Sequence, residues 1–189
     1  MNLPNKLTVL RVVLIPFFIA FILIDSIPLN ILWAGIVFGV ASITDLIDGK
    51  IARQQNLVTN FGKFLDPIAD KILVMATLLC FTNKGWIDVV AVFVILTREF
   101  IVSGLRLVVA GEGIVVPAGI WGKLKTASTM ATLGVIMACE FFFVDLGWFG
   151  IDFNFYIIYE IMIWICAVIT VISGMTYVSA YKGYINPND

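Results

Sequence analysis

The first long apolar run of this chain reads Val12-Val13-Leu14-Ile15-Pro16-Phe17-Phe18-Ile19-Ala20-Phe21-Ile22-Leu23-Ile24 and contains no charged or strongly polar side chain. With its flanks it reaches the length of about 20 largely apolar residues that a helix needs to cross a bilayer. The run follows Lys6 and Arg11, as a signal peptide would, but Asp25-Ser26-Ile27-Pro28 after it lacks a small-x-small cleavage site. We therefore predict a retained transmembrane span over residues 8–27.

The composition of the whole chain agrees with a membrane protein. Of its 189 residues, 61% are hydrophobic and 13% are charged, and the formal net charge is −1. A soluble domain is about 45–50% apolar and about 25% charged, and a disordered chain is more polar still. Nucleic-acid binding requires clustered excess cations, which this charge balance does not provide. The sequence thus predicts an integral membrane protein with a single domain over residues 1–189.

Six segments have the length and apolar character of a transmembrane helix. We place these spans at about residues 8–27, 30–50, 64–83, 86–108, 124–146 and 153–181. No internal repeat and no linker separates them into groups. The predicted fold is therefore an all-α integral membrane protein with six transmembrane helices, with or without a short N-terminal interfacial helix.

Lysine and arginine residues indicate which side of the membrane each loop occupies. On one side of the predicted spans lie Lys6, Arg11, Lys50, Arg53, Lys63, Arg106, Lys123, Lys125 and Lys182. Lys84 falls on the other side, together with Asp25, Asp88, Asp145 and Asp152. Because cytoplasmic loops carry an excess of lysine and arginine, we expect both termini and the loops 50–63 and 109–123 to be cytoplasmic.

The absence of histidine limits the chemistry that this chain can perform. Without an imidazole, mechanisms that need a histidine base, a histidine metal ligand or a Ser/His pair are excluded. Cys80, Cys139 and Cys166 lie far apart in apolar runs without metal-binding spacing, so we interpret them as small buried hydrophobic residues. The reactive groups must therefore be carboxylates, cations and hydroxyls.

Four aspartates stand out because charges within membrane spans are costly and are usually functional. Asp45 and Asp48 share one helix face at i, i+3, and Asp66 and Asp70 share another at i, i+4. The spans that carry them are joined by the short loop 54–61, so we expect antiparallel neighbours whose four carboxylates face one another. Two divalent cations would neutralise this cluster, and its oxygen ligands favour Mg²⁺, Mn²⁺ or Ca²⁺. Such a site suits displacement at phosphorus.

Spacing alone leaves two other interpretations of the aspartates open. They form a structural ion-pair network if Arg53, Lys63 and Lys71 neutralise them, or they form the cation site of an ion-coupled transporter. The small residues Gly49, Ala52 and Gly62 are equally ambiguous, because they allow either a nucleotide phosphate or a neighbouring helix to approach the backbone. Arg53 offers a planar fork for a pyrophosphate.

Together these residues form the pattern D-x2-D-G-x2-A-R-x8-G-x3-D-x3-D from Asp45 to Asp70. The pattern resembles, position for position, the signature of the CDP-alcohol phosphotransferase family. This resemblance implies six transmembrane helices, a cytoplasm-facing site in a bacterial cytoplasmic membrane, and usually a homodimer. It also implies transfer of a substituted phosphate group from a CDP-linked donor to an alcohol, with release of CMP.

The resemblance assigns roles to the matching positions. It implies that Asp45, Asp48 and Asp66 ligate two divalent cations, Mg²⁺ or Mn²⁺, and that Asp70 is the general base and also touches a metal. It places one set of positions around the cytidine and diphosphate of the donor: Gly49, Ala52, Arg53 and Gly62, with further donor contacts expected from Thr59 and Thr8.

Three further stretches resemble one branch of this family, the bacterial phosphatidylglycerophosphate synthases. They are Asn2 to Arg11 with Pro16, Arg98 to Arg106, and Gly122 to Thr126. The branch implies CDP-diacylglycerol as donor, sn-glycerol 3-phosphate as acceptor, and phosphatidylglycerophosphate and CMP as products. Another headgroup transferase of the family, either a cardiolipin synthase or a phosphatidylinositol-phosphate synthase, is the alternative, and an ion-coupled transporter is a remote one.

The residues of these stretches independently indicate an anion site. Arg98 and Arg106 are eight residues apart, about two helical turns, and so project from nearly one face. Lys123 and Lys125 begin span five on the same side, and Glu99 is expected to pair with one of the cations. We predict a basic pocket beside the metal site that binds the phosphate of glycerol 3-phosphate. The two lysines are alternatively ordinary cytoplasmic anchors.

Overall fold

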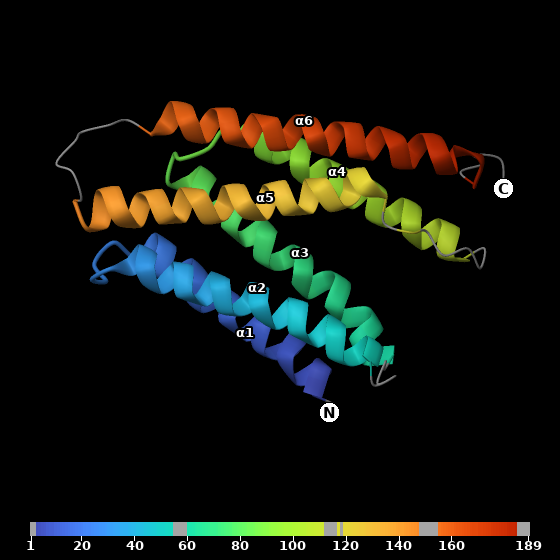
Figure 1. The fold of residues 1–189 in the computed structure, drawn as a ribbon, viewed down its shortest axis with the longest axis horizontal. Helices are drawn as coiled ribbons and strands as arrows, with labels where there is room; N and C mark the ends of the chain where they lie inside the picture. The colour runs from blue at the N-terminus through green and yellow to red at the C-terminus, as the bar shows by residue number, and fades with distance from the viewer. Residues whose placement is uncertain (1–2, 55–59, 112–116, 118, 148–154, 185–189) are drawn as a thin grey trace. The chain divides into compact units, whose positions relative to one another are not determined.

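The computed structural model describes residues 3–54, 60–111, 117, 119–147 and 155–184 of the 189-residue chain, and the regular elements of these parts are all helical (Figure 1). They are α1 (Leu3–Leu23), α2 (Asn30–Gln54), α3 (Asn60–Asn83), α4 (Val89–Gly111), α5 (Ile120–Cys139), a π-helical segment η1 (Glu140–Asp145), α6 (Tyr156–Tyr181) and a 3₁₀ turn η2 (Lys182–Tyr184). The six α-helices of the described parts correspond in order to the six predicted spans. This confirms the predicted all-α class.

The helices group into two compact units, each of which is considered by itself. The first comprises residues 1–84 and 134–153, and the second comprises residues 85–133 and 154–189. The boundary in the fifth helix lies between Leu133 and Gly134. The single domain expected from the sequence stays a prediction.

In the first unit, α1 packs against both α2 and α3 (Figure 1). Its buried side chains recur every three to four residues, which places them on one helical stripe: Asn5, Thr8, Arg11, Ile15, Phe18 and Ile22. The Phe18 and Phe38 rings lie 6.1 Å apart between centroids and join α1 to α2. Among the described residues, α2 and α3 contact each other less than either contacts α1. The expectation that they are directly paired antiparallel helices with facing carboxylates stays a prediction.

The first helix differs from its predicted bounds of 8–27. It begins at Leu3, because Pro4 lies in the first turn, where no backbone N–H bond is needed. It ends at Leu23, before a turn that contains Pro28 and then Leu29, whose φ is +54°. Since α1 runs unbroken from Leu3, no separate interfacial helix precedes it within the described residues.

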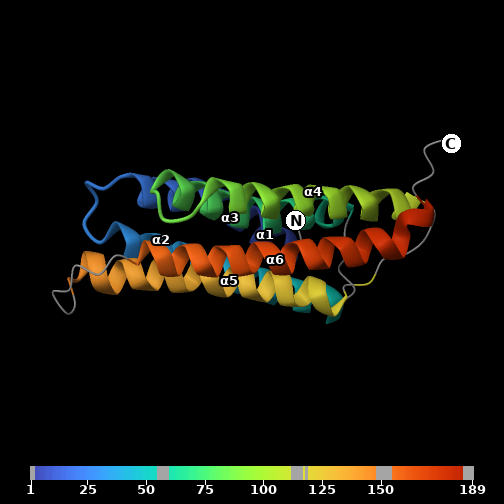
Figure 2. The ribbon, with the colours of Figure 1, turned by 90° about the horizontal axis from the view of Figure 1, so that it is seen from above.

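In the second unit, α4 packs along α6 (Figure 2). The buried residues Val102, Leu105 and Val109 of α4 form a core cluster with Tyr177 of α6, and Tyr181 packs against this cluster. The helix α5 adds a contact of 3.2 Å between Thr132 Oγ1 and Cys166 Sγ of α6. Helices in lipid associate through such close packing and polar contacts, because burial from lipid supplies little hydrophobic driving force.

The predicted span 124–146 contains a change of helix type. The α-helix ends at Cys139, and residues Glu140–Asp145 continue as a π-helix, in which Leu146 N–H donates to Phe141 O at 3.0 Å. Single π-turns inside helices are rare and frequently lie near functional sites. Glu140, at the start of this segment, is 8% exposed.

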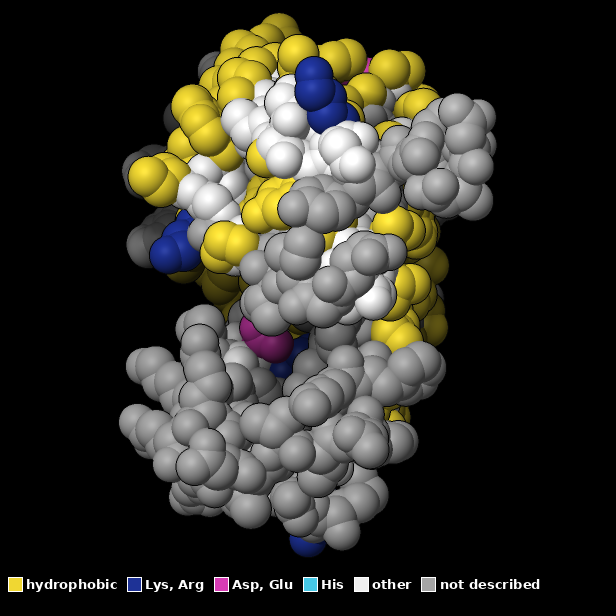
Figure 3. Space-filling view, turned by 90° about the vertical axis from the view of Figure 1, so that its right-hand side faces the viewer, with side chains coloured by type: hydrophobic (Ala, Val, Ile, Leu, Met, Phe, Trp, Pro, Cys, Tyr) yellow, Lys and Arg dark blue, Asp and Glu magenta, His cyan; other side chains and the backbone are white. Residues whose placement is uncertain are grey.

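Within the part of the chain that the structure describes, three helical segments are long and apolar enough to cross a membrane by length and composition: Asn5–Leu23, Ile120–Phe143 and Tyr156–Tyr181. Many large hydrophobic side chains are exposed, including Phe93, Leu107 and Ile157. Figure 3 shows hydrophobic side chains over much of the described surface on one face, with isolated lysines and arginines among them. A soluble monomer rarely exposes so much contiguous apolar surface. The chain is therefore a membrane protein, and the number of six spans stays a prediction.

Candidate active site

The backbone places the motif aspartates at corresponding ends of two helices of the first unit. Asp45 and Asp48 lie in the C-terminal half of α2, and Asp66 and Asp70 lie in the N-terminal half of α3. In the chain, only residues 55–59 separate the C-terminal end of α2 from the N-terminal end of α3. Several residues of the predicted site are described only by their helical backbone, so their side chains lie outside the described part of the chain: Asp48, Gly49, Ala52, Arg53, Asp66 and Asp70. Thr59 lies outside the described residues altogether.

Asp45 is the motif aspartate whose side chain is described, and it pairs with an arginine. Its Oδ1 lies 2.8 Å from Arg11 Nη1, and the two side chains are 41% and 1% exposed respectively. Arg11 belongs to the buried stripe of α1, and Asp45 follows Phe38 and Ala41 on the stripe of α2 that faces it. Arg11 is thus a buried partner of the motif and not a surface anchor, a role that the sequence analysis did not identify.

Two predicted donor-binding residues are described near these helices. Thr8, which is fully buried, precedes Arg11 by one turn on α1, and Gly62 is buried in the first turn of α3. Among the described residues, no three His, Cys, Asp or Glu side chains gather in a way that could hold a metal ion. The four-aspartate arrangement accordingly stays a prediction.

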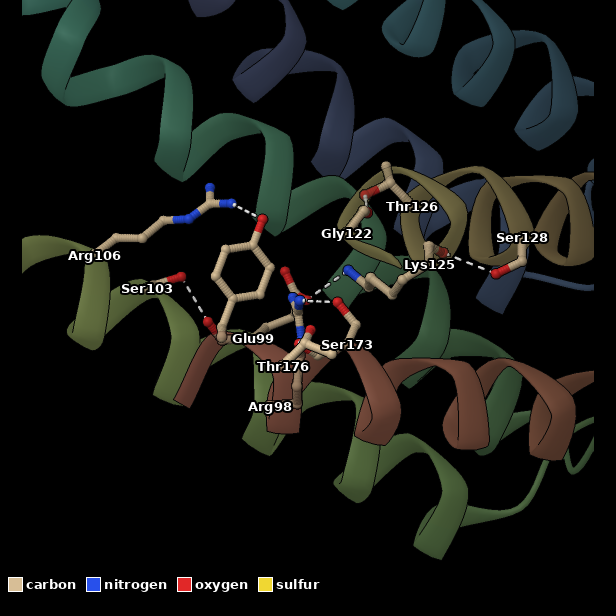
Figure 4. Close-up of polar contacts among 11 residues, drawn as sticks. Arg98, Glu99, Ser103, Arg106, Gly122, Lys125, Thr126, Ser128, Ser173 and Thr176 are labelled. Atoms are coloured by element: carbon tan, nitrogen blue, oxygen red, sulfur yellow. Dashed lines mark hydrogen bonds and ion pairs between the residues drawn. The ribbon is translucent and has the colours of Figure 1, made fainter. Parts of the chain in front are cut away.

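A cluster of charges forms in the second unit around Glu99 of α4. Its Oε1 accepts a hydrogen bond of 2.8 Å from Arg98 Nη1 and forms an ion pair of 2.6 Å with Lys125 Nζ of α5. Arg98 Nη2 donates to Ser173 Oγ of α6 at 2.6 Å. Figure 4 shows these side chains pointing toward one another from α4, α5 and α6. The expectation that Glu99 pairs with a cation is confirmed, and it pairs with two.

Burial makes the cluster around Glu99 tight. The side chains of Arg98, Glu99 and Lys125 are 11%, 18% and 8% exposed. Charges are buried at this level only when they are paired, because each ion loses several kcal/mol of hydration. Gly174 lets Arg98 approach α6, since a Cβ at this glycine would lie 2.9 Å from Arg98 Cγ.

Arg106 joins the cluster through Tyr177. Its Nη2 donates to the Tyr177 hydroxyl at 2.9 Å, and its guanidinium carbon lies 5.0 Å from the centre of the Tyr177 ring. The Arg98 guanidinium carbon lies 5.6 Å from the same ring centre. Arg98 and Arg106 therefore do share one side of α4, as their spacing predicts. Arg106 is exposed, whereas Arg98 is largely buried.

The four predicted cations do not all participate. Lys125 is buried against Glu99, whereas the Lys123 side chain is exposed and forms no ion pair or hydrogen bond with another described side chain. Residues two positions apart on a helix point to different sides, so the two lysine side chains are separated. The remaining cluster holds three cations and one carboxylate, so it carries two net positive charges. This charge complements a phosphate dianion.

Ser173 and Tyr177 are the site residues that the sequence analysis missed. Both lie on the buried stripe of α6, where small and polar residues recur every three to four positions: Cys166, Thr170, Ser173, Gly174 and Tyr177. In an otherwise apolar helix such a stripe marks a packed helix interface. The signal was present in the sequence, but it does not reveal that the stripe faces two arginines.

Comparison with known proteins identifies the family. The family model described as CDP-alcohol phosphatidyltransferase matches residues 1–177. The chain belongs to the CDP-alcohol phosphatidyltransferase family. The match contains both the aspartate motif and the charged cluster that ends at Tyr177.

Curated members of this phosphatidyltransferase family resemble the chain over nearly its whole length. The CDP-diacylglycerol–glycerol-3-phosphate 3-phosphatidyltransferase of Bacillus subtilis (strain 168) is 41% identical, with 94% of each chain covered. The protein of the same name from Haemophilus influenzae is 37% identical, with 99% of this chain and 97% of that one covered.

A solved structure has a similar fold. The phosphatidylinositol phosphate synthase of Mycobacterium tuberculosis in its apo form matches with a TM-score of 0.62, covering 98% of this chain and 93% of that one. Its sequence identity is 18%, so this likeness concerns the fold alone.

Proposed function

We propose that this protein transfers the phosphatidyl group of CDP-diacylglycerol to sn-glycerol 3-phosphate, giving phosphatidylglycerophosphate and CMP. The observation that carries the choice of acceptor is the cluster of Arg98, Glu99, Lys125 and Arg106, whose two net positive charges suit a phosphate dianion. The names of relatives that are 35–41% identical over nearly the full chain support both substrates.

The aspartate motif fits a pair of divalent cations in its chemistry. Its donors are carboxylates without histidine or cysteine, which favours Mg²⁺ or Mn²⁺. Asp45 pairs with Arg11 through one carboxylate oxygen, and a carboxylate has a second oxygen with which to ligate. Asp45, Asp48, Asp66 and Asp70 would hold the ions. When bound, the ions supply charge neutralisation at the donor diphosphate.

The remaining motif residues serve the donor and the proton transfer. Gly49, Ala52, Arg53, Thr59, Gly62 and Thr8 are proposed to contact the cytidine diphosphate portion of CDP-diacylglycerol. The 1-hydroxyl oxygen of glycerol 3-phosphate bonds to the phosphorus that carries diacylglycerol, and the bond from that phosphorus to the CMP oxygen breaks. Asp70 orients this hydroxyl and takes its proton as bonding to phosphorus develops.

The acceptor site is proposed to rest on Arg106 and Arg98, with Lys125 completing the positive charge. Arg106 is exposed and has donors beyond the one that it gives to Tyr177, so it is the guanidinium best suited to contact the acceptor phosphate directly. Both Nη groups of Arg98 already donate to protein groups, which makes Arg98 the more structural of the two. Lys123 is proposed to contribute only through its exposed charge.

The cellular setting belongs to the same proposal. A lipid-linked donor requires a membrane location, and the charge bias of the loops favours both termini and the active site on the cytoplasmic side of a bacterial cytoplasmic membrane. The family resemblance supports a homodimer whose chains each form one catalytic domain.

The test is CMP release by purified protein in lipid vesicles that contain CDP-diacylglycerol and Mg²⁺ or Mn²⁺. Four acceptors are compared: glycerol 3-phosphate, inositol 1-phosphate, serine and phosphatidylglycerol. We expect turnover with glycerol 3-phosphate that a chelator abolishes. Turnover with another acceptor would contradict the acceptor assignment but keep the transferase, and no turnover with any of the four would overturn the proposed reaction.

A further inference from the structure

Tyr177 occupies the centre of the charged cluster, yet it carries no charge itself. It lies near the C-terminal end of α6 and is 5% exposed. Part of its ring packs in the core cluster with Val102, Leu105 and Val109 of α4. A phenylalanine would fill the same apolar space, so the buried hydroxyl requires its own explanation, because burying a hydroxyl is costly unless it is hydrogen-bonded.

The Tyr177 hydroxyl uses its whole hydrogen-bonding capacity. It accepts from Arg106 Nη2 and from the backbone N–H of Gly119, each at 2.9 Å, and it donates to the carbonyl of Pro117 at 3.3 Å. A phenol has one donor and two acceptor positions. The hydroxyl of this α6 residue therefore connects α6 to the C-terminal part of α4 and to the residues just before α5.

The Tyr177 ring contacts both arginines. The guanidinium carbons of Arg98 and Arg106 lie 5.6 Å and 5.0 Å from its centre, within the range of cation–π attraction. Each arginine side chain has about 2 kcal/mol of rotamer entropy, so an exposed arginine that is already fixed loses less freedom when it binds an anion. Arg106 is the exposed arginine of this pair.

We propose that Tyr177 is a positioning residue that holds Arg106 in the conformation that binds the acceptor phosphate, and so sets the affinity for the acceptor. The proposal rests on the proposed function and deepens it. Tyr177 acts through Arg106 and does not touch the reacting atoms. Its removal should therefore weaken acceptor binding while donor binding and the chemical step persist.

The direct test replaces Tyr177 by phenylalanine, which keeps the ring and removes the hydroxyl. We expect Tyr177→Phe to raise the KM for glycerol 3-phosphate about tenfold, the effect of losing a hydrogen bond to a charged group, with the KM for CDP-diacylglycerol and kcat nearly unchanged. Tyr159→Phe is the matched control, because Tyr159 is a buried tyrosine of the same helix that stacks on Phe155. An unchanged acceptor KM in Tyr177→Phe, or equal changes in both KM values, would overturn the proposal.

A double-mutant cycle tests whether Tyr177 acts through Arg106. In the Arg106→Ala background, Tyr177→Phe should change the acceptor KM less than twofold, because the group that it positions is gone. If the two substitutions instead multiply their separate effects, they act independently. That result would contradict the positioning role.

A second pair of variants perturbs Tyr177 without altering it, in case Tyr177→Phe fails to fold. A Cβ at Gly122 would lie 3.0 Å from the Tyr177 hydroxyl oxygen, so in Gly122→Ala this hydroxyl has to give way by a few tenths of an ångström. A Cβ at Gly104 of α4 would meet no atom within 4 Å, and Gly104→Ala is the control. We expect Gly122→Ala, and not Gly104→Ala, to raise the acceptor KM. Equal behaviour of the two variants would count against the proposal.

An error in the proposed reaction can be distinguished from an error in the role proposed for Tyr177. If the unaltered protein does not turn over glycerol 3-phosphate, the reaction is wrong, and the role of Tyr177 is then decided by binding alone. Glycerol 3-phosphate and inorganic phosphate should each raise the thermal unfolding temperature of the unaltered protein in detergent, and should raise that of Tyr177→Phe much less. Equal stabilisation of the two proteins, or of neither, would overturn the inference.

Discussion

Arg98 and Arg106 are both arginines on the same side of α4, but their surroundings give one a structural role and the other a binding role. Arg98 is 11% exposed and donates to Glu99 and Ser173 through its two Nη groups, whereas Arg106 is exposed and donates to Tyr177. A buried, hydrogen-bonded charge contributes mainly to structure, because its partners are left unsatisfied when it is removed. An exposed arginine with remaining donors contributes mainly to binding.

This difference predicts unequal effects of two alanine substitutions. Arg106→Ala should raise the KM for glycerol 3-phosphate about 10-fold to 100-fold, the range for charged hydrogen bonds, with little change in the thermal unfolding temperature. Arg98→Ala should also raise the acceptor KM, but it should in addition destabilise the protein by about 3 kcal/mol, because Ser173 and Glu99 lose a buried partner. Kinetics with both substrates and thermal unfolding in detergent check this. Equal KM changes for donor and acceptor would count against the pocket.

At the scale of elements, α4 and α6 depend on a close approach at Gly174. A Cβ there would lie 2.9 Å from Cγ of Arg98, which is part of the side-chain stem and not its mobile end. The stem cannot shift without disturbing the bonds from the guanidinium to Glu99 and Ser173. The glycine therefore determines both the helix packing and the position of the arginine.

We predict that Gly174→Ala lowers the free energy of unfolding by about 1–3 kcal/mol, the cost of overpacking, and raises the acceptor KM. Gly104→Ala lies in the partner helix where a Cβ meets nothing within 4 Å, so it should be neutral or slightly stabilising. Thermal unfolding of both variants in detergent checks this. Wild-type stability in Gly174→Ala would mean that α6 and α4 are farther apart than described.

The elements also show what the sequence can and cannot predict. The apolar runs and the turn-forming residues between them predict where the helices lie, because a membrane helix must be about 20 residues long and apolar. Polarity did not reveal that α1 lies against both motif-bearing helices, because partner choice depends on shape. Arg11 lies on the stripe of Thr8, Ile15 and Phe18, which marks it as buried, but only the fold shows that Asp45 is its partner. Tyr177 was missed for the same reason.

At the scale of the whole molecule, the number of spans decides where the charged loops lie. Six spans would return the C-terminal end to the side of the N-terminus. If only the three long apolar segments found among the described residues crossed, the C-terminal end would lie on the opposite side; these segments are Asn5–Leu23, Ile120–Phe143 and Tyr156–Tyr181. The ion pair of Lys84 with Asp25 requires the two ends that follow α1 and α3 to share one side, which both arrangements allow.

Single cysteines distinguish these arrangements. In a background with Cys80, Cys139 and Cys166 replaced by alanine, cysteines are introduced at three exposed positions, Ser26, Lys123 and Lys182. With six spans and cytoplasmic termini, a membrane-impermeant maleimide added to intact cells should label Ser26→Cys, whereas Lys123→Cys and Lys182→Cys should react only after the membrane is permeabilised. Three spans would expose all three positions to the outside reagent. Retained CMP release in each variant ensures that the labelled protein is the folded enzyme, and external labelling of Lys182→Cys would refute the six-span arrangement.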